Sequence, residues 1–186
     1  SKGAAEHATI RMCLRQMVEV FAGSGTLTRA FRKIGWSGLP VDVATNDVVV
    51  TSTDLTSEDA RNRLRATLRT AAVKFIHVAT PCASFSRARK SDGGPKALRS
   101  PSCILGLQNL RGADQLKIHN GNVFAELTAK VALQAMQDHK HFSIENPLSS
   151  LLWRHPAIQR LRGLPGELIV RFDMCAYGAK WQKPTA

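Results

Sequence analysis

A cysteine with a proline before it and cations after it stands out at residues 79–90 (ATPCASFSRARK). It follows the apolar run FIHV, so we expect Cys82 at the end of a strand. A thiolate is a strong, soft nucleophile, and Pro81 would help to fix the turn that presents it. The alternative is a buried, inert side chain, because cysteine is among the residue types most often buried.

A candidate acid ends a later apolar run, at residues 141–146 (HFSIEN). Glu145, followed by Asn146 and Pro147, could hydrogen-bond a polar ring and stabilise charge that develops on it. The alternative is an ordinary glutamate at a strand end. A cysteine protease would instead need a histidine as base, and the six histidines offer no recognisable partner motif.

A glycine turn lies in residues 18–31 (VEVFAGSGTLTRAF), where Phe21, Gly23 and Gly25 separate a predicted strand from a predicted helix. Glycine permits positive φ and lets a ligand approach the backbone closely. The turn lacks the third glycine of the dinucleotide fingerprint and the Lys-Ser/Thr pair of a P-loop. A plain strand-to-helix connection therefore stays open as the alternative.

Two acids follow at or near predicted strand ends, Asp42 and Asp54. Open parallel sheets bind ligands at the carboxyl ends of their strands. Asp42 could accept both ribose hydroxyls of an adenosine-containing cofactor, and Asp54 could accept from an adenine amino group. The alternative for both is a loop or helix-capping acid.

The strands that must position these residues are predicted from apolar runs at 17–23, 36–44, 72–80 and 141–146, with a fifth candidate at 168–178. Helical periodicity predicts helices at 26–35, 57–71 and 122–139. Gly35 is the expected C-cap of the first helix, and Thr56 with Asp59 forms a weak capping box for the second. The interval 86–121 lacks clear periodicity, which is typical of a functional or mobile loop.

Strands that alternate with helices predict an α/β fold with a mainly parallel sheet and helices on both faces. The 186 residues suffice for one domain, which we expect over residues 10–186 behind a loose N-terminal tail at 1–9. The four cysteines show neither zinc-site nor disulfide spacing, so we expect no metal and a reducing, intracellular compartment (the nucleus in a eukaryote). No apolar run approaches membrane-spanning length, so we expect no membrane partner.

The charge balance favours a polyanionic partner. The chain has 26 Lys and Arg against 14 Asp and Glu, a formal net charge of +12. Such an excess favours nucleic acid, although a merely basic surface is the alternative. Cations concentrate after Cys82 and along the face formed by Arg61, Arg65 and Arg69, where solvated arginines without a partner are the alternative.

In their order along the chain, these elements resemble the cytosine-5 DNA methyltransferases. Residues 20–25 (VFAGSG) look like the family's first motif, D-x-F-x-G-x-G, and residues 80–86 (TPCASFS) look like its Pro-Pro-Cys-Gln-x-Phe-Ser loop. Residues 122–124 (NVF) resemble the motif before its Glu-Asn-Val strand, and residues 144–146 (IEN) resemble that strand. Residues 177–183 (YGAKWQK) are similar to its Tyr-Gly-x-Pro-Gln segment.

The resemblance implies a Rossmann-like methyltransferase fold and methyl transfer from S-adenosylmethionine to C5 of cytosine in DNA, with S-adenosylhomocysteine as product. Cys82 would be the nucleophile, and Glu145 would hold the ring. The cofactor would contact Phe21, Gly23, Ser24, Gly25, Asp42, Asp54, Pro81, Asn122 and Val123. Nucleic acid would contact Ser84, Ser86, Arg87, Arg89, Lys90, Arg99, Lys180 and Lys183, with Lys96 also among the cations after Cys82.

Departures from the family pattern shape the remaining expectations. Ala83 stands where the family has glutamine, and Pro147 where it has valine. The large target-recognition domain and the final strand are missing from these residues, so we expect a minimal or divergent relative whose partner supplies target recognition. Alternatives are an RNA cytosine methyltransferase, transfer to an exocyclic amine, and an inactive module that binds nucleic acid. The Asp/Asn-Pro-Pro-aromatic signature of amine methyltransferases is absent from the sequence.

Overall fold

The computed structural model describes residues 15–43, 51–87, 95–177, 180 and 183–186. The chain divides into two compact units, Ser1–Ala79 with Val131–Ser143 and Thr80–Lys130 with Ile144–Ala186. Strands alternate with helices, so the predicted α/β fold is confirmed. The tail expected at 1–9 lies outside the described residues. No helix in the described part of the chain is long and apolar enough to cross a membrane.

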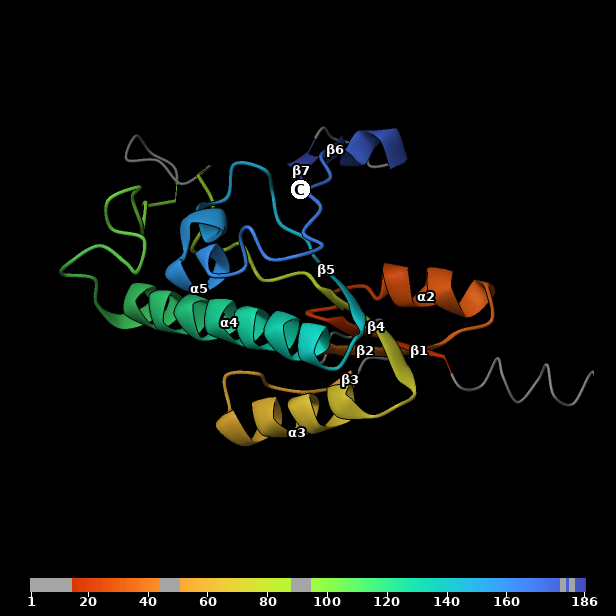
Figure 1. Ribbon diagram of the computed structural model, residues 1–186. Coiled ribbons are helices and arrows are strands. Elements are labelled where there is room, and N and C mark those ends of the chain that lie inside the picture. Colours follow the sequence, from red (N-terminus) through yellow and green to blue (C-terminus); the bar gives the residue numbers. More distant parts are fainter. Residues whose placement is uncertain (1–14, 44–50, 88–94, 178–179, 181–182) are drawn as a thin grey trace, which may run out of the picture. The chain divides into compact units, whose positions relative to one another are not determined.

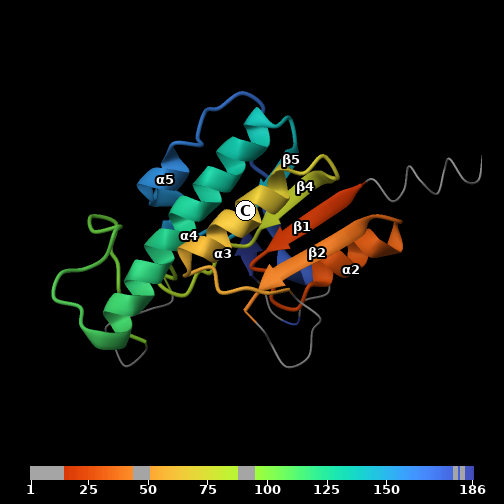
Figure 2. The ribbon, with the colours of Figure 1, turned by 90° about the horizontal axis from the view of Figure 1, so that it is seen from below.

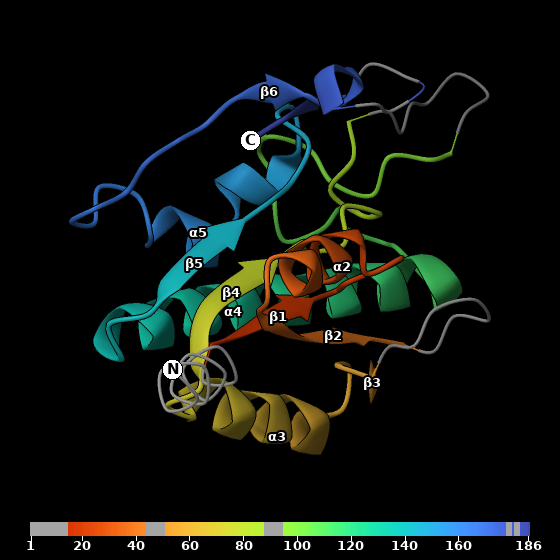
Figure 3. The same cartoon turned by 90° about the vertical axis from the view of Figure 1, so that its right-hand side faces the viewer.

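The first unit is built on a five-stranded sheet with the order β3-β2-β1-β4-β5. Its strands are β1 (Gln16–Val20), β2 (Ser37–Asp42), β3 (Thr51–Ser52), β4 (Val73–Val78) and β5 (His141–Ile144). Figure 2 shows β2, β1, β4 and β5 side by side. β1 pairs in parallel with β2 and with β4, and β2 pairs in parallel with β3. In Figure 3 the arrows of β1, β4 and β5 point the same way.

Burial explains why these runs become strands of a parallel sheet. Met17, Val18 and Val20 of β1 are fully buried although they alternate between the two faces. Such a run is typical of a central strand that is covered on both sides. The predicted strands at 17–23, 36–44, 72–80 and 141–146 are confirmed with shorter bounds. The two residues of β3 are too few to give a sequence pattern, and this strand was not predicted.

The helices α2 (Thr26–Lys33) and α3 (Glu58–Arg69) lie on opposite faces of this sheet (Figure 1). From α2, the Phe31 ring stacks on Phe75 of β4 with 5.2 Å between the ring centroids. α2 ends at Lys33 with Ile34 as its C-cap, and Gly35, which the sequence predicts as the C-cap, follows one residue later with a φ of 83°.

The spacing of Ala60, Leu64, Leu68 and Ala71 predicts one apolar stripe, and α3 buries the first three, whereas Ala71 is exposed beyond the end of the helix. Each of the two leucines contributes about 1.5–3 kcal/mol by leaving water. The predicted capping box is wrong. Ser57 is the N-cap, and Thr56 donates its hydroxyl to Asp54 at 2.7 Å instead.

The long helix α4 runs over Gly112–Gln137 and begins well before the predicted start at residue 122. Its first turns lack an apolar stripe, as the 59% exposure of Leu116 shows, so hydrophobic periodicity could not reveal them. Asn122 therefore lies inside a helix and does not open one. Part of the interval 86–121, predicted to be a loop, is helical.

The second unit contains short elements around a small antiparallel ladder. These elements are the 3-10 helix Leu151–Arg154, α5 (Pro156–Gln159), β6 (Phe172–Asp173), the 3-10 helix Met174–Tyr177 and β7 (Pro184–Thr185). β6 pairs antiparallel with β7, and Thr185 also forms a bridge with Pro147. The fifth strand predicted at 168–178 is reduced to the two residues of β6. Leu168 and Val170 are 84% and 57% exposed, so no apolar layer among the described residues covers them.

Candidate active site

The glycine turn follows β1 directly and has left-handed backbone at three positions. The φ angles of Phe21, Gly23 and Gly25 are 59°, 52° and 65°. The amide of Gly25 donates to the carbonyl of Ala22 at 2.8 Å, which closes the turn. A Cβ atom built on Gly23 would meet nothing within 4 Å. The backbone at Gly23 is therefore open to a close neighbour.

Asp42, at the end of β2, lies against this turn. Its Oδ2 accepts a 2.7 Å hydrogen bond from the amide of Gly23, and its Oδ1 accepts one of 2.7 Å from the amide of Val43. A carboxylate has about four lone-pair sites, so both oxygens can still accept from a ligand. The side chain thus fixes the turn and keeps acceptor capacity.

Glu19 is a supporting residue that the sequence analysis did not single out. It is 6% exposed in the middle of β1. Its Oε2 accepts from the amide of Thr28 at 2.7 Å and from the Thr28 hydroxyl at 2.5 Å. It thereby satisfies a free amide in the first turn of α2, where Gly25 offers no side chain for capping. An acid inside an otherwise apolar strand was the available signal.

Asp54 behaves as a loop acid. It accepts from the Thr56 hydroxyl at 2.7 Å and from the Thr56 amide at 2.9 Å. These hydrogen bonds, first that of the side chain and then that of the backbone, lower the pKa of Asp54. The geometry is that of a local turn around an exposed carboxylate, which favours the alternative interpretation of this residue.

In the second unit, Cys82 is half-buried in a turn held from several sides. The amide of Phe85 donates to the Cys82 carbonyl at 2.9 Å. The hydroxyls of Thr80 and Thr128, both buried, lie 2.7 Å apart. Phe85 is fully buried, and its carbonyl accepts from the amide of Leu151 at 2.9 Å. The backbone around the thiol is thus fixed on both sides.

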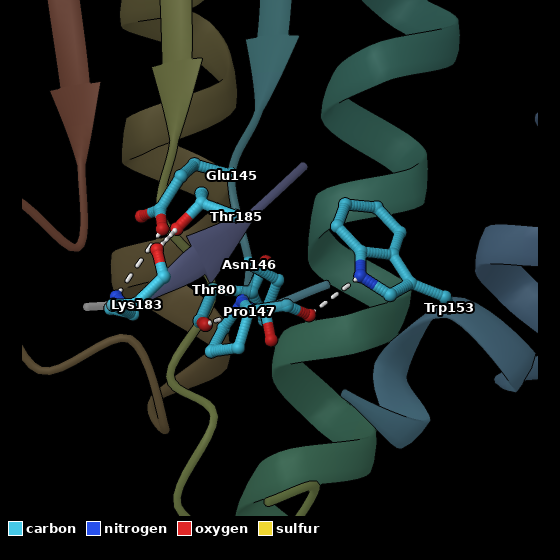
Figure 4. Close-up of polar contacts among 7 residues, drawn as sticks. All are labelled: Thr80, Glu145, Asn146, Pro147, Trp153, Lys183 and Thr185. Atoms are coloured by element: carbon cyan, nitrogen blue, oxygen red, sulfur yellow. Dashed lines mark hydrogen bonds and ion pairs between the residues drawn. The ribbon is translucent and has the colours of Figure 1, made fainter. Parts of the chain in front are cut away.

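The segment that carries Glu145 is tied to the segment that carries Cys82. Asn146 donates from Nδ2 to the carbonyl oxygen of Thr80 over 2.6 Å (Figure 4). Asn146 is 1% exposed and Thr80 is 2% exposed, so water does not compete for this bond. Asn146 directly follows Glu145, and Thr80 precedes Pro81 and Cys82. The two predicted catalytic residues therefore belong to bonded segments of one unit.

Glu145 has a cationic partner. Lys183 Nζ lies 3.4 Å from Glu145 Oε1, and Figure 4 shows the two side chains directed toward each other. The Glu145 side chain is 24% exposed and that of Lys183 is 37% exposed. Lys183 was predicted to contact nucleic acid, and in this structure its ammonium group contacts the candidate acid.

A small backbone ladder places Lys183 beside Glu145. Asn146 and Ala186 exchange backbone hydrogen bonds of 3.0 and 3.1 Å, and the amide of Leu148 donates to the carbonyl of Pro184 at 2.9 Å. The Trp153 indole closes the other side by donating to the Pro147 carbonyl at 2.9 Å (Figure 4). Residues 183–186 thus pair with the segment that follows Glu145 and form one side of its surroundings.

The predicted nucleic-acid contacts divide into surface and buried groups. Arg87, Lys96 and Lys180 are exposed, and Ser86 is half-buried. Arg89 and Lys90 lie outside the described residues. The predicted nucleic-acid contacts of Arg99 and Ser84 are wrong. These residues are only 4% and 3% exposed, so a phosphate cannot reach them in this conformation.

Asn122 is a further correction among the predicted cofactor contacts. Its Oδ1 accepts from Arg99 at 2.7 Å and its Nδ2 donates to the Leu105 carbonyl at 2.9 Å, so both polar atoms of its amide are bonded to protein groups of the second unit. Its neighbour Val123, also in α4, is half-buried. Pro81, another predicted cofactor contact, precedes Cys82 and is half-buried too.

The predicted arginine face of α3 is engaged within the first unit. Arg61 donates to the carbonyls of Leu55 and Thr56 at 3.0 and 2.6 Å. Arg69 donates to Gln134 Oε1 at 2.8 Å. These bonds engage two of the three predicted arginines with protein groups, so these two are not solvated arginines without a partner, and the phosphate contact of the face stays a prediction.

Comparisons with models of protein families, with curated proteins and with solved structures find no match to this chain. Inferences about function therefore rest on the site geometry and on the motifs themselves.

Proposed function

We propose that the chain transfers a methyl group from S-adenosylmethionine to C5 of cytosine in DNA, with Cys82 as nucleophile and Glu145 as the acid that holds the ring. The observation that carries this proposal is the 2.6 Å hydrogen bond from Asn146 to the Thr80 carbonyl. It joins the backbone next to Glu145 to the backbone next to Cys82. Covalent addition to a ring needs a nucleophile and a stabilising group in a fixed relationship.

The glycine turn of the first unit fits the cofactor that this reaction needs. Gly23 offers open space at positive φ, and Asp42 keeps acceptor capacity for ribose hydroxyls beside it. Phe21, Ser24 and Gly25 belong to the same turn. When bound, S-adenosylmethionine supplies the electrophilic methyl group that C5 accepts.

Cys82 and Glu145 would perform the remaining chemistry. The Cys82 thiolate forms a bond to C6 of cytosine, and the electron pair of the C5–C6 double bond moves to C5 and into the ring. The Glu145 carboxyl shares a proton with N3 and accepts a hydrogen bond from the exocyclic amino group, and the proton at N3 neutralises this charge. Once C5 carries the methyl group, its proton leaves to a base, the double bond forms again, and the Cys82 thiolate is expelled.

The basic surface supports a nucleic acid as the substrate. A base in a duplex must leave the stack before the half-buried Cys82 thiol can reach it. Arg87, Lys96 and Lys180 are exposed cations of the second unit, and the chain carries a net charge of +12. We assign these three residues to phosphate contacts around the extruded base.

Methyl transfer from labelled cofactor to DNA and to RNA, followed by identification of the nucleoside, tests the proposal. We expect label in 5-methylcytosine from DNA, lost in Cys82→Ser and kept in Cys175→Ser, which changes an exposed cysteine of the same unit. Label in RNA alone would identify an RNA cytosine methyltransferase. Label on an exocyclic amine would contradict the covalent chemistry, and cofactor binding without transfer would leave a binding module.

A further inference from the structure

Arg99 is a buried cation for which no described acidic side chain forms an ion pair. The residue is 4% exposed. No ion pair between described side chains includes it. Burial lowers the pKa of Arg99 to about 10, so its guanidinium remains charged at neutral pH. A buried charge is costly unless its hydrogen-bonding groups are satisfied, so its placement calls for an explanation.

The guanidinium satisfies its donors with neutral groups from three stretches of the second unit. Nε and Nη2 donate to the Ser84 hydroxyl at 3.3 and 3.0 Å. Nη1 donates to Asn122 Oδ1 at 2.7 Å and also to the Ile104 carbonyl, and Nη2 donates to the Ile118 carbonyl at 3.3 Å. One planar group thus links the turn after Cys82, the loop near residue 104 and the helix α4.

The flat face of Arg99 completes this arrangement. Its guanidinium carbon lies 3.8 Å from the centroid of the Phe85 ring. Gly121 of α4 lies so close that a Cβ atom there would collide with the Ser84 hydroxyl and come within 2.7 Å of Arg99 Nη2. Ser84 and Phe85 end the turn that begins at Cys82. The Phe85 amide closes this turn by donating to the Cys82 carbonyl. Arg99 therefore contacts the 82–85 turn and α4 at the same time and connects the two.

We propose that Arg99 is a positioning residue for Cys82, which fixes the 82–85 turn through the Ser84 hydroxyl and the Phe85 ring. The catalytic consequence rests on the proposed function, whereas the fixing of the turn does not. A lysine would keep the charge, but its ammonium group has three donors and no planar fork. It cannot bond four acceptors and cover the Phe85 ring at the same time.

The test compares Arg99→Lys with the wild type and with Arg160→Lys, which changes an exposed arginine paired with Glu126 in the same unit. Amide hydrogen exchange of the 80–86 segment reports on the turn without any substrate. A DNA duplex with 5-fluorocytosine in place of cytosine, added together with S-adenosylmethionine, reports on Cys82, because after methyl transfer the fluorine at C5 cannot leave as a proton does and the enzyme stays attached. DNA affinity and the urea midpoint are measured on the same samples.

We expect Arg99→Lys to remain folded and to exchange the Phe85 amide at least about tenfold faster. We also expect its adduct to form at least about tenfold more slowly while DNA affinity stays within about twofold, because only positioning is lost. Arg160→Lys should match the wild type in every readout. Wild-type exchange and adduct rates in Arg99→Lys would overturn the inference and leave the proposed function standing.

Two further outcomes separate the possibilities. Normal exchange with an equal loss of DNA affinity and adduct rate would make Arg99 a phosphate ligand and overturn the inference. Faster exchange in Arg99→Lys, together with no adduct even in the wild type, would support the fixing of the turn and contradict the proposed function.

Discussion

Asn146 holds Thr80 through a hydrogen bond of 2.6 Å from its side-chain Nδ2 to the Thr80 carbonyl, and both residues are almost fully buried. The bond links the segment after β5 to the segment after β4, which are far apart in sequence. In the described part of the chain, the second polar atom of that side chain, Asn146 Oδ1, is buried without a partner. The Asn146 side chain therefore acts here through its donor, and a residue that cannot donate should destabilise this contact.

Asn146→Ala should lower the free energy of unfolding by about 1–3 kcal/mol, because it leaves the buried Thr80 carbonyl without a donor. Asn146→Asp has nearly the same shape but places a carboxylate against that carbonyl, so its loss should be larger. Urea unfolding measures both, with the exposed Ser149→Ala as control. A loss in Asn146→Asp no greater than in Asn146→Ala would contradict this role.

Gly23→Val should abolish measurable S-adenosylmethionine binding in calorimetric titration, because the added side chain fills the open space beside Asp42. Gly163→Val is the matched control. Gly163 has a φ of 75°, also with nothing within 4 Å of an added Cβ, so the backbone strain is similar while the site is not touched. Equal cofactor affinity in the two variants would contradict the assignment of the glycine turn.

Arg87→Ala should reduce the salt dependence of DNA binding. Each phosphate contact contributes a slope of about 0.9 in the logarithm of the binding constant against the logarithm of salt concentration. Arg69→Ala is the control, since Arg69 is bonded to Gln134 within the first unit. Fluorescence titrations over a salt series give both slopes. If Arg69→Ala lowers the salt slope and Arg87→Ala does not, the assignment of the DNA phosphate contact to Arg87 is wrong.

The stability of the fold should fall below about pH 6.5, partly through His155. Burial, first, and the Arg99 charge, second, lower the pKa of His155 from its ordinary 6.5, with Glu126 acting against them and Arg160 with them. The unfolded chain therefore takes up the proton at a higher pH than the folded chain does. This contribution is fully present above the ordinary pKa and is lost as the pH falls.

His155→Asn tests this sign, because asparagine can also accept the 3.2 Å hydrogen bond from the Ala157 amide but does not titrate. Between about pH 7.5 and about pH 5.5, the wild type should lose more free energy of unfolding than the variant, by up to about 1.4 kcal/mol per pH unit. Equal losses in urea unfolding would remove His155 from the pH dependence.

Local pattern was enough to predict the strands that carry the candidate residues and the positions of Asp42 and the glycine turn at strand ends. It failed where tertiary contacts decide. From the sequence, Arg99 is one more cation after Cys82. Its burial depends on contacts with Ser84 and Asn122, which are distant in sequence, so the local pattern does not reveal it. Lys183 contacts Glu145 only because the ladder with residues 146–148 brings the C-terminal residues there. Hydrophobic periodicity carries neither kind of information.

The central claim is that Cys82 attacks cytosine while Glu145 holds the ring, and trapping with 5-fluorocytosine DNA in the presence of cofactor tests it most directly. We predict a denaturant-stable adduct in the wild type and in Cys175→Ser, none in Cys82→Ser, and formation slower by about two orders of magnitude or more in Glu145→Gln. An adduct that persists in Cys82→Ser, or methylated DNA formed without any adduct in the wild type, would contradict the account.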